Sequence, residues 1–407
     1  MTDPAVSSSK AKPQFIALIA ALMALNALAI DILLPALPAL GAAYGVVEAN
    51  HRQYVIGAYM LGFGIGQLGL GPVSDWLGRR KPLLAGLAVY VIAAFAALAA
   101  PSFETLIALR LLQGLGAAAT RVVTNSVVRD LYAGRAMAEI MSLAFMVFMI
   151  VPIIAPAIGE ILLLTGHWGL VFAFMGGLAV VVTFWAWRAL PETLPVERRR
   201  PLTLASVIEG FSLVISNRMA FSYGVAGLFM FAAVMGFITQ AQQIYVEIYG
   251  LGSLFPVAFA AVAGLMAVAS FANARIVQRI GMRRLSHGAI IIHVILAGIL
   301  TLASLTMTVP FWLFFTLLAG IMFMFGWSSS NFNALSMEPL GAVAGTASSV
   351  FGFIQTVGGA LLGSYIGQQF DMSVRPVAIG YLITGLGALI CCLVAEKGRL
   401  FRVGQPS

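Results

Sequence analysis

Long apolar stretches follow one another along most of this 407-residue chain, and each is about the length of a bilayer crossing. Because a transmembrane helix needs about 20 consecutive apolar residues, the sequence predicts an all-α integral membrane protein with twelve transmembrane helices. The composition supports this, since 61% of the residues are hydrophobic and only 9% are charged, whereas about a quarter of the residues in soluble proteins carry charge. The expected helices are residues 14–40, 52–72, 80–100, 104–128, 137–163, 168–188, 219–243, 253–274, 285–306, 310–335, 344–368 and 376–396.

The longest polar connection, residues 191–218, divides these stretches into two sets of six. We therefore expect an N-terminal six-helix bundle over residues 1–190, a cytosolic linker over 191–218 and a C-terminal six-helix bundle over 219–407. A weak repeat supports this duplication, because residues 274–284 keep the final glycine and the basic end of residues 71–81. Parallel halves of this kind predict a substrate path between them, near the middle of the membrane.

The basic residues indicate how the chain crosses the membrane. With the N-terminus inside, almost all Lys and Arg residues of the connections fall on the cytosolic side, and only Arg52 and Arg375 fall on the other. Because cytosolic loops carry the excess of Lys and Arg, we expect a multi-pass protein of the bacterial inner (plasma) membrane with both termini in the cytosol. The first apolar stretch is too long for a signal-peptide core of about 7–15 residues, so it is expected to be retained.

Several function classes do not fit this sequence. A formal net charge of +8 indicates nucleic-acid binding only where the basic residues gather on one face, and here they are dispersed between apolar stretches. The two cysteines, Cys391 and Cys392, are adjacent, and the four histidines are scattered singly. The sequence therefore offers neither a metal-ligand set nor a nucleophile–base spacing. We expect no enzyme activity, no nucleic-acid partner, no metal and no cofactor.

Charged residues inside the apolar stretches are the first candidates for function, because a charge at that depth is costly. These are Asp31, Arg110 and Arg121. At 1.5 Å per residue, Asp31 in the ascending first helix and Arg110 in the descending fourth helix reach nearly the same height in the outer half. We therefore expect Asp31 to face Arg110, directly or through water. Glu160 is expected at the outer rim, as a solvated residue of the mouth.

Two interpretations of Asp31 and Arg110 stay open. Burial favours the neutral carboxyl and a nearby arginine favours the carboxylate, so movement between two environments lets Asp31 bind and release a proton. Alternatively, the two residues form a permanent ion pair that only fixes helix packing. Arg121 is expected close to the cytosolic side, where an acidic substrate or the carboxylates of Asp75 and Asp130 neutralise it, or where it simply reaches the interface.

A short basic turn joins the second and third stretches, Gly71-Pro-Val-Ser-Asp-Trp-Leu-Gly-Arg-Arg-Lys-Pro82. Its glycines let two helices approach closely, and its basic residues stay in water. The spacing G-x3-D-x2-G-R-R/K resembles the loop between helices two and three of the major facilitator superfamily. Further motifs, in chain order, resemble the drug:proton antiporters of its bicyclomycin/chloramphenicol-resistance branch: Asp31-Ile-Leu-Leu-Pro-Ala-Leu-Pro38, Arg110-x-x-Gln-Gly-x-Gly116, Val128-Arg-Asp-Leu-Tyr132, Leu190-Pro-Glu-Thr-Leu194 and Pro339-x-Gly-x-x-Ala-Gly-Thr-Ala347.

The resemblance covers essentially the whole chain and implies the fold of that superfamily. It also implies a cytosolic gate, to which it assigns Gly71, Asp75, Gly78, Arg79, Arg80 and Asp130. Arg79 is expected to pair with Asp130 at the end of the fourth helix, and the alternative is that the loop only forms a tight hairpin. The fifth-helix motif of the antiporters, Gly-Pro-x-x-Gly-Gly, reads Ala155-Pro-Ala-Ile-Gly-Glu160 here, which departs from the exporter pattern.

Candidate substrate contacts are polar and aromatic residues that are expected to face the path at mid-depth. They are Asn26, Tyr59, Gln113, Phe229, Met230 and Gln355. A pocket of Phe, Met and a few amides suits lipophilic molecules, because Met adapts its shape to several ligands. The alternative for each residue is lipid contact or helix packing.

Together these features predict a secondary active transporter that exports small lipophilic compounds, including antibiotics, in exchange for protons by alternating access. It would act as a monomer in the lipid bilayer, driven by the proton gradient. One alternative is a proton-coupled importer of a metabolite with the same fold, since the motifs do not set the direction of transport. Another is a membrane receptor or assembly protein without transport activity.

Overall fold

The computed structural model describes residues 13–132, 134–199, 212 and 214–401. Contacts divide the chain into two units, the first made of Met1–Val46 with Ala58–Ser206 and the second of Val47–Gly57 with Val207–Ser407. Residues 200–211 and 213 of the expected linker lie outside the described residues. The two units are described separately below.

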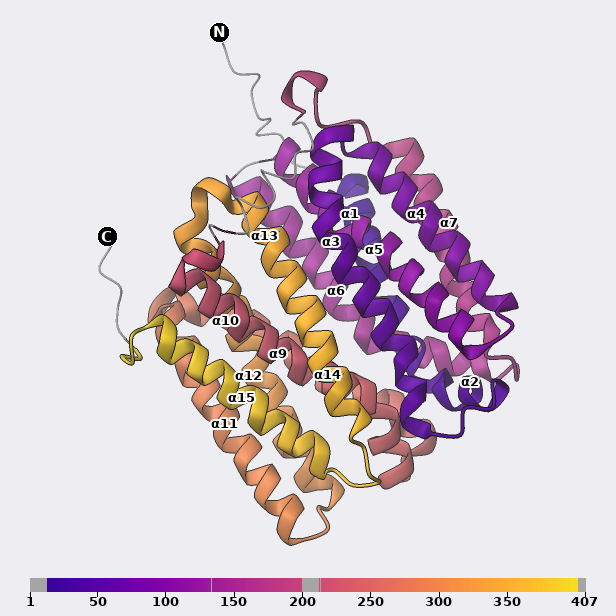
Figure 1. Cartoon of the computed structure of the whole chain (residues 1–407), viewed down its shortest axis with the longest axis vertical. Helices are drawn as coiled ribbons and strands as arrows, with labels where there is room; N and C mark the ends of the chain where they lie inside the picture. The colour runs from indigo at the N-terminus through magenta and orange to yellow at the C-terminus, as the bar shows by residue number, and fades with distance from the viewer. Residues whose placement is uncertain (1–12, 133, 200–211, 213, 402–407) are drawn as a thin grey trace. The chain divides into compact units, whose positions relative to one another are not determined.

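The described residues of the first unit form helices joined by short connections (Figure 1). Its elements are α1 (Pro13–Asp31), η1 (Leu34–Ala36), α2 (Leu37–Ala43), α3 (Tyr54–Leu77, whose first turn belongs to the second unit), α4 (Arg80–Ala96), η3 (Ala97–Ala99), α5 (Phe103–Leu131), α6 (Gly134–Leu163), α7 (Gly169–Ala189) and η4 (Val196–Arg198).

The second unit is equally helical where it is described. Its elements are η2 (Ala49–Gln53), α9 (Arg218–Gln242), η5 (Gln243–Ile248), η6 (Gly252–Leu254), α10 (Phe255–Ile280), α11 (Met282–Thr306), α12 (Phe311–Met337), η7 (Glu338–Val343), α13 (Ala344–Phe353), η8 (Ile354–Gly358), α14 (Gly359–Gln368) and α15 (Arg375–Ala395). Two of these, η5 and η8, are π-helical and interrupt longer helices, a distortion that is frequent at functional sites.

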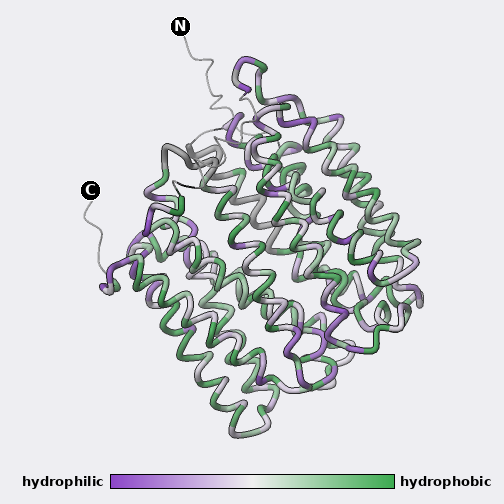
Figure 2. The backbone as a smooth tube through the Cα atoms, in the orientation of Figure 1, coloured by the Kyte–Doolittle hydropathy of each residue, from purple (hydrophilic) through white to green (hydrophobic). Residues whose placement is uncertain are grey.

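The helices have the length and apolarity that a membrane requires. Eleven spans in the described residues are long and apolar enough to cross a bilayer, and α6 contributes a further apolar segment, Ile150–Leu163. Hydrophobic residues dominate the long helices, while many helix ends and connections are hydrophilic (Figure 2). The predicted all-α membrane fold with twelve transmembrane helices is therefore confirmed, and the observed spans, such as Phe103–Leu131 for the expected 104–128, differ by a few residues at each end.

Side-chain caps and glycines explain how α5 starts and where it packs. The helix begins after Ser102, whose Oγ accepts the N–H of Thr105 at 3.2 Å, a typical N-cap. Small residues let membrane helices approach closely, and α5 uses them on two sides. A Cβ atom at Gly114 would overlap the carbonyl oxygen of Tyr59 on α3, and one at Gly116 would overlap the carbonyl oxygen of Gly86 on α4.

The second unit is built around α9, which packs against α12, α14 and α15. Asn217 starts α9, because its Oδ1 accepts the N–H of Ala220 at 2.9 Å. The core of this unit is a cluster of fully buried side chains that includes Tyr223, Met230 and Phe332. Such burial in a helical bundle indicates a packing role.

The close approach of α5 to α3 predicts the effect of a single methyl group. Alanine normally stabilises a helix interior by about 0.5–1 kcal/mol relative to glycine, but Gly114→Ala places a Cβ against the backbone of Tyr59. Overpacking of this kind costs about 1–3 kcal/mol, so we expect a lower midpoint of thermal unfolding in detergent micelles. Gly69→Ala on α3 is the control, because no atom lies within 4 Å of its Cβ position. Equal melting of the two variants would contradict the packing argument.

Candidate functional site

Asp31 lies where the first span changes from one helix to the next. The α-helix ends at Asp31, and the chain continues through η1 and α2. Pro35 explains the break, because proline has no N–H to bond the carbonyl four residues earlier, which is that of Asp31. The side chain of Asp31 is only 3% exposed, and its Oδ1 has no hydrogen-bond partner in the described part of the chain. On α6, a Cβ atom at Gly159 would overlap the carbonyl oxygen of Ile32, so α6 packs directly against this break.

Arg110 of α5 is fully buried and gathers polar groups from three helices. Its Nη2 donates to the carbonyl oxygen of Ala29 on α1 at 2.8 Å, and its Nη1 donates to Oε1 of Gln113 at 2.6 Å. The guanidinium lies 4.4 Å from the centre of the Tyr59 ring on α3, within the range of a cation–π interaction. The Tyr59 hydroxyl donates to Oδ1 of Asn26 on α1 at 2.8 Å. We call Asn26, Ala29, Tyr59, Arg110 and Gln113 the Arg110 cluster.

The expected direct contact between Asp31 and Arg110 is not formed. Arg110 reaches α1 at the predicted level, but it binds the backbone of Ala29, two residues before Asp31. The ion pairs of the described side chains do not include Asp31. The rise per residue gives the depth of a residue along its helix. The direction of its side chain depends on how the helix is rotated about its axis, and the rise per residue does not give that rotation. A contact through water stays a prediction.

The predicted substrate contacts fall into two groups. Asn26, Tyr59 and Gln113 are buried and come together in the Arg110 cluster. In the second unit, Met230 is fully buried in the hydrophobic core, and the Phe229 ring lies against Gly387 of α15. These two positions match the packing alternative.

Gln355 is the predicted contact of the second unit with free hydrogen-bonding capacity. It lies in the π-helical segment η8 and is half-buried. Its Nε2 has no hydrogen-bond partner among the described residues, and its side chain occupies the space beside Gly227 on α9. A buried amide N–H without a partner is costly, which makes Gln355 a candidate for binding an acceptor group of a ligand.

The loop between α3 and α4 is organised around Arg79, whose side chain is buried. Gly78 turns the chain with a φ of 93°, a conformation that glycine adopts without strain. Arg79 then donates through Nε to Oδ2 of Asp130 at 2.8 Å and through Nη1 to Asp75 and Ser74. The predicted pairing of Arg79 with Asp130 is confirmed. Burial works against the charge of the guanidinium, but the hydrogen bonds from it to Asp130 and Asp75 raise the pKa of Arg79 above its ordinary value.

Sequence reasoning missed Glu192, which ties the segment after α7 to this loop. Its carboxylate accepts the backbone N–H groups of Arg79 at 2.8 Å and of Arg80 at 3.2 Å, as well as those of Thr193 and Leu194. The hydroxyl of Thr193 donates to Oδ2 of Asp130 at 3.1 Å. Burial opposes ionisation of Glu192, but these backbone N–H groups lower the pKa of Glu192 below its ordinary value of 4.5. The motif Leu190–Leu194 was visible in the sequence, but nothing in it indicated a partner some 110 residues earlier.

Arg121 and Glu160 lie apart from these clusters. Arg121 lies on the same helix as Arg110 but is exposed, whereas Arg110 is buried, and the ion pairs of the described residues do not include Arg121. Glu160 is half-buried near the end of α6. In the loop, the carbonyl of Gly71 accepts the hydroxyl of Ser74 at 2.9 Å, and Nη2 of Arg80 donates to the carbonyl of Trp187 at 2.5 Å.

A second polar cluster, also missed, lies in the second unit. Nε2 of Gln53 donates to Oε1 of Gln243 at 2.6 Å, and Nε2 of Gln243 donates to Oδ1 of Asn50 at 2.9 Å. Nε2 of Gln368 completes the cluster by donating to the carbonyl of Asn50 at 2.7 Å. Gln243 and Gln368 belong to different elements, η5 and α14. Amides both donate and accept, so such a cluster is satisfied without charge.

A multi-pass helical protein with buried polar clusters inside its bundle is typical of membrane transport proteins. The model of the Major Facilitator Superfamily matches residues 19–363, so the chain belongs to this family and is a transport protein for small molecules rather than an enzyme.

The chain is similar to named members of the family. It is 31% identical to the Multidrug resistance protein D of Escherichia coli, over 95% of this chain and 96% of the relative. It is 30% identical to the Bicyclomycin resistance protein homolog of Haemophilus influenzae, over 79% of this chain and 81% of the relative. The crystal structure of the human organic anion transporter MFSD10 (TETRAN) has the same fold, with a TM-score of 0.65 at 21% identity over 95% of this chain and all of the other.

The backbone contacts of Glu192 predict a pH-dependent effect on stability. Because its pKa is lowered in the folded protein, the ionised carboxylate contributes stability that is fully present above pH 4.5 and is lost as the pH falls through the lowered value. Glu192→Gln is therefore expected to lower the thermal unfolding midpoint at pH 7, and the difference from the parent protein should shrink as the pH is lowered below about 4.5. Glu197→Gln, in the same segment, is the control. A difference between Glu192→Gln and parent that stays constant from pH 7 to pH 3 would contradict the role of the carboxylate.

Proposed function

We propose that this protein is a secondary active transporter that exports small lipophilic compounds, antibiotics among them, in exchange for protons by alternating access. Support comes first from its relatives, which are named for bicyclomycin resistance and multidrug resistance. The observation that carries the proposal is the buried carboxyl of Asp31 at a helix break beside the Arg110 cluster. Such a group is rare inside a membrane protein unless it takes part in function.

In this proposal Asp31 is the proton-binding group. An ionised carboxylate without a hydrogen-bond partner is very costly in an apolar interior, whereas a protonated carboxyl is much less so. Oδ1 of Asp31 is buried without a hydrogen-bond partner among the described residues, which supports this role. A conformation that exposes Asp31 to water, or brings it to the guanidinium of Arg110, favours the carboxylate and releases the proton.

The substrate is proposed to bind against the Arg110 cluster. Tyr59 offers an aromatic ring and Asn26 and Gln113 offer amides, a combination that suits lipophilic molecules with few polar groups. In the second unit, Gln355 is a separate proposed substrate contact, because its Nε2 has no hydrogen-bond partner among the described residues. Drug and proton then compete, because a compound that displaces Gln113 or Tyr59 changes the contacts of Arg110 and therefore the electrostatic environment of Asp31.

Arg79 and its carboxylate partners form the proposed cytosolic gate, together with Gly71, Gly78 and Arg80. The ion pairs of Arg79 with Asp75 and Asp130 join the loop to the end of α5. Breaking a buried ion pair leaves an uncompensated charge, so these contacts give the loop two distinct states. The non-transporting alternative, a receptor or assembly protein, has no need for such a device.

The proposal includes the setting of the protein. It would work as a monomer in the bacterial inner membrane with both termini in the cytosol, and the proton gradient would drive it without a cofactor. The alternative within the same fold is proton-coupled import of a metabolite, and the two differ in whether the substrate moves against the proton or with it.

Proton movement in inside-out vesicles tests the proposal. Adding a lipophilic antibiotic to vesicles with an acidified lumen is expected to release protons from the lumen with the parent protein. Asp31→Asn is expected to reduce this release by at least about tenfold, because the amide cannot bind a transferable proton. Asp371→Asn is the matched control, since Asp371 is exposed on a loop, where Ser373 donates to it through its backbone N–H and its hydroxyl.

Each other outcome removes a defined part of the proposal. Drug-dependent proton release that survives Asp31→Asn would keep the exporter and rule out Asp31 as the coupling group. Equal loss in Asp371→Asn would show that any lost carboxylate impairs the protein. No release with any compound of a lipophilic panel would overturn the export proposal in favour of metabolite import or of a protein without transport activity.

A further inference from the structure

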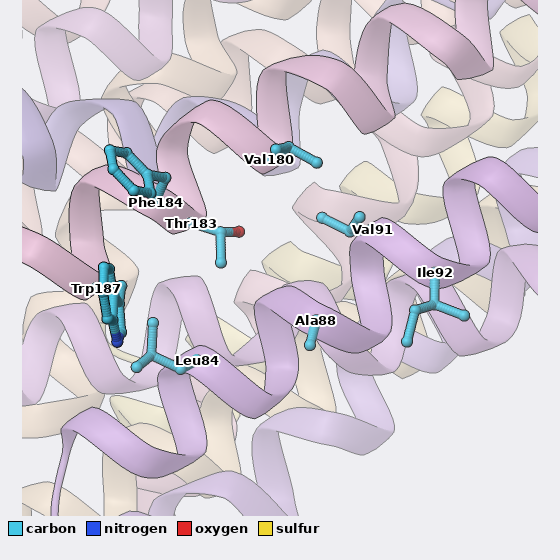
Figure 3. A pocket seen from close by; sticks show the side chains of 8 residues that line it. All are labelled: Leu84, Ala88, Val91, Ile92, Val180, Thr183, Phe184 and Trp187. Carbon is cyan, nitrogen blue, oxygen red and sulfur yellow. The ribbon is translucent and has the colours of Figure 1, made fainter.

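A groove opens between α4 and α7 on the surface of the first unit (Figure 3). Its volume is about 480 Å³, within the range of small-molecule sites of about 300–1,000 Å³. Ile92 on α4 is 65% exposed, and Phe184 and Trp187 on α7 are 60% and 49% exposed. All three belong to membrane-spanning helices, so the groove faces the hydrocarbon of the bilayer.

The groove is shaped to hold a chain-like apolar ligand. On α4 it is lined by one stripe of residues from Leu84 to Ile92, which covers about 12 Å of helix at 1.5 Å per residue. Ala88 lies in this stripe one turn from Leu84 and one turn from Ile92, and it is the smallest of the lining side chains (Figure 3). Thr183 also lines the groove, but its hydroxyl donates to the carbonyl of Ala179 on its own helix at 2.6 Å. This hydroxyl proton therefore needs no acceptor from a ligand in the groove.

One end of the groove is basic. Arg188 follows Trp187, and its guanidinium lies 5.9 Å from the Trp187 ring and 6.0 Å from the Phe184 ring. Lys81 is exposed one turn before Leu84 on α4. The nearby carboxylate of Glu192 is occupied by backbone N–H groups, and the ion pairs of the described residues include neither Lys81 nor Arg188. Among the described residues, no ion pair neutralises the cations at this end.

We propose that this groove binds an anionic phospholipid of the surrounding bilayer. An acyl chain lies along the stripe from Leu84 to Ile92, and the headgroup phosphate, whose negative charge is not offset by a cation of the headgroup, lies on Arg188 and Lys81. Basic sites at the ends of transmembrane helices select anionic headgroups because the surface potential and direct charge pairing act together. The site is separate from the Arg110 cluster and does not depend on the proposed export activity.

Charge and shape favour a lipid over a second copy of this chain. Helix pairs that associate in membranes use small residues, which let the backbones approach closely. Here the rim of the groove consists of the bulky side chains of Ile92, Phe184 and Trp187. A basic end would also meet an identical basic end in a two-fold dimer, and the two would repel each other.

Native mass spectrometry of the full-length protein in detergent tests the proposal directly. The protein is titrated with phosphatidylglycerol and with phosphatidylcholine of identical acyl chains. We expect phosphatidylglycerol to bind about tenfold more tightly to the parent protein, as two cations near a headgroup would produce. The double variant Lys81→Gln/Arg188→Gln should lose this preference and keep its affinity for phosphatidylcholine. Arg375→Gln/Lys397→Gln, which removes two basic residues of the second unit, is the matched control.

The groove itself is tested by filling it. Ala88→Phe is expected to weaken the binding of both lipids at least about tenfold, because the phenyl ring occupies the part of the groove where an acyl chain would lie. Ala88→Leu provides a second, smaller filling if the larger one prevents folding, as judged by circular dichroism. Equal affinity of the parent protein for the two lipids would overturn the proposal, as would an unchanged preference in the double charge variant. A parent dimer that Ala88→Phe converts to monomer would identify a second copy as the occupant.

Discussion

The first unit depends on one buried guanidinium. Arg110 is held by a backbone carbonyl of α1, an amide of its own helix and the ring of Tyr59 on α3. These neutral groups bind the guanidinium without adding a charge of their own. This arrangement requires α5 to lie close to α3, which Gly114 permits because any Cβ there would overlap the backbone of Tyr59. The sequence Arg110-x-x-Gln-Gly thus encodes the charge, one of its acceptors and the close approach together.

The buried guanidinium of Arg79 is bound in a different way. It is also buried, but it lies between the carboxylates of Asp75 and Asp130, and Glu192 binds the backbone N–H of the same residue. The local charge is therefore compensated, and the cluster joins α3, α5 and the segment after α7 by contacts that are strong only when all partners are present. A cluster whose charges are balanced in this way suits a gate that is either closed or open.

How far the sequence predicts this structure depends on the kind of information each feature needs. The helices follow from the apolar stretches, and the Arg79–Asp130 pair follows from the resemblance of the loop. The end of α1 at Asp31 was not predicted, although the sequence contains Pro35, because the apolar stretch continues unbroken to residue 40. The π-helical segments η5 and η8 do not alter the hydropathy pattern, so they could not be predicted from it. Depth along a helix placed Arg110 level with the end of α1, but only the packing of α1 against α5 and α6 determines that it binds Ala29.

The proposed coupling follows from the net charge of the first unit's interior. Protonation of Asp31 makes the charge near the Arg110 cluster more positive by one unit, and ionisation makes it more negative by one unit. A lipophilic cation is then repelled in the first case and accepted in the second, because charges interact strongly over several ångströms in a medium of low dielectric constant. Drug and proton can therefore exclude each other without touching the same atom, and the absence of a direct Asp31–Arg110 ion pair leaves Asp31 able to change its charge.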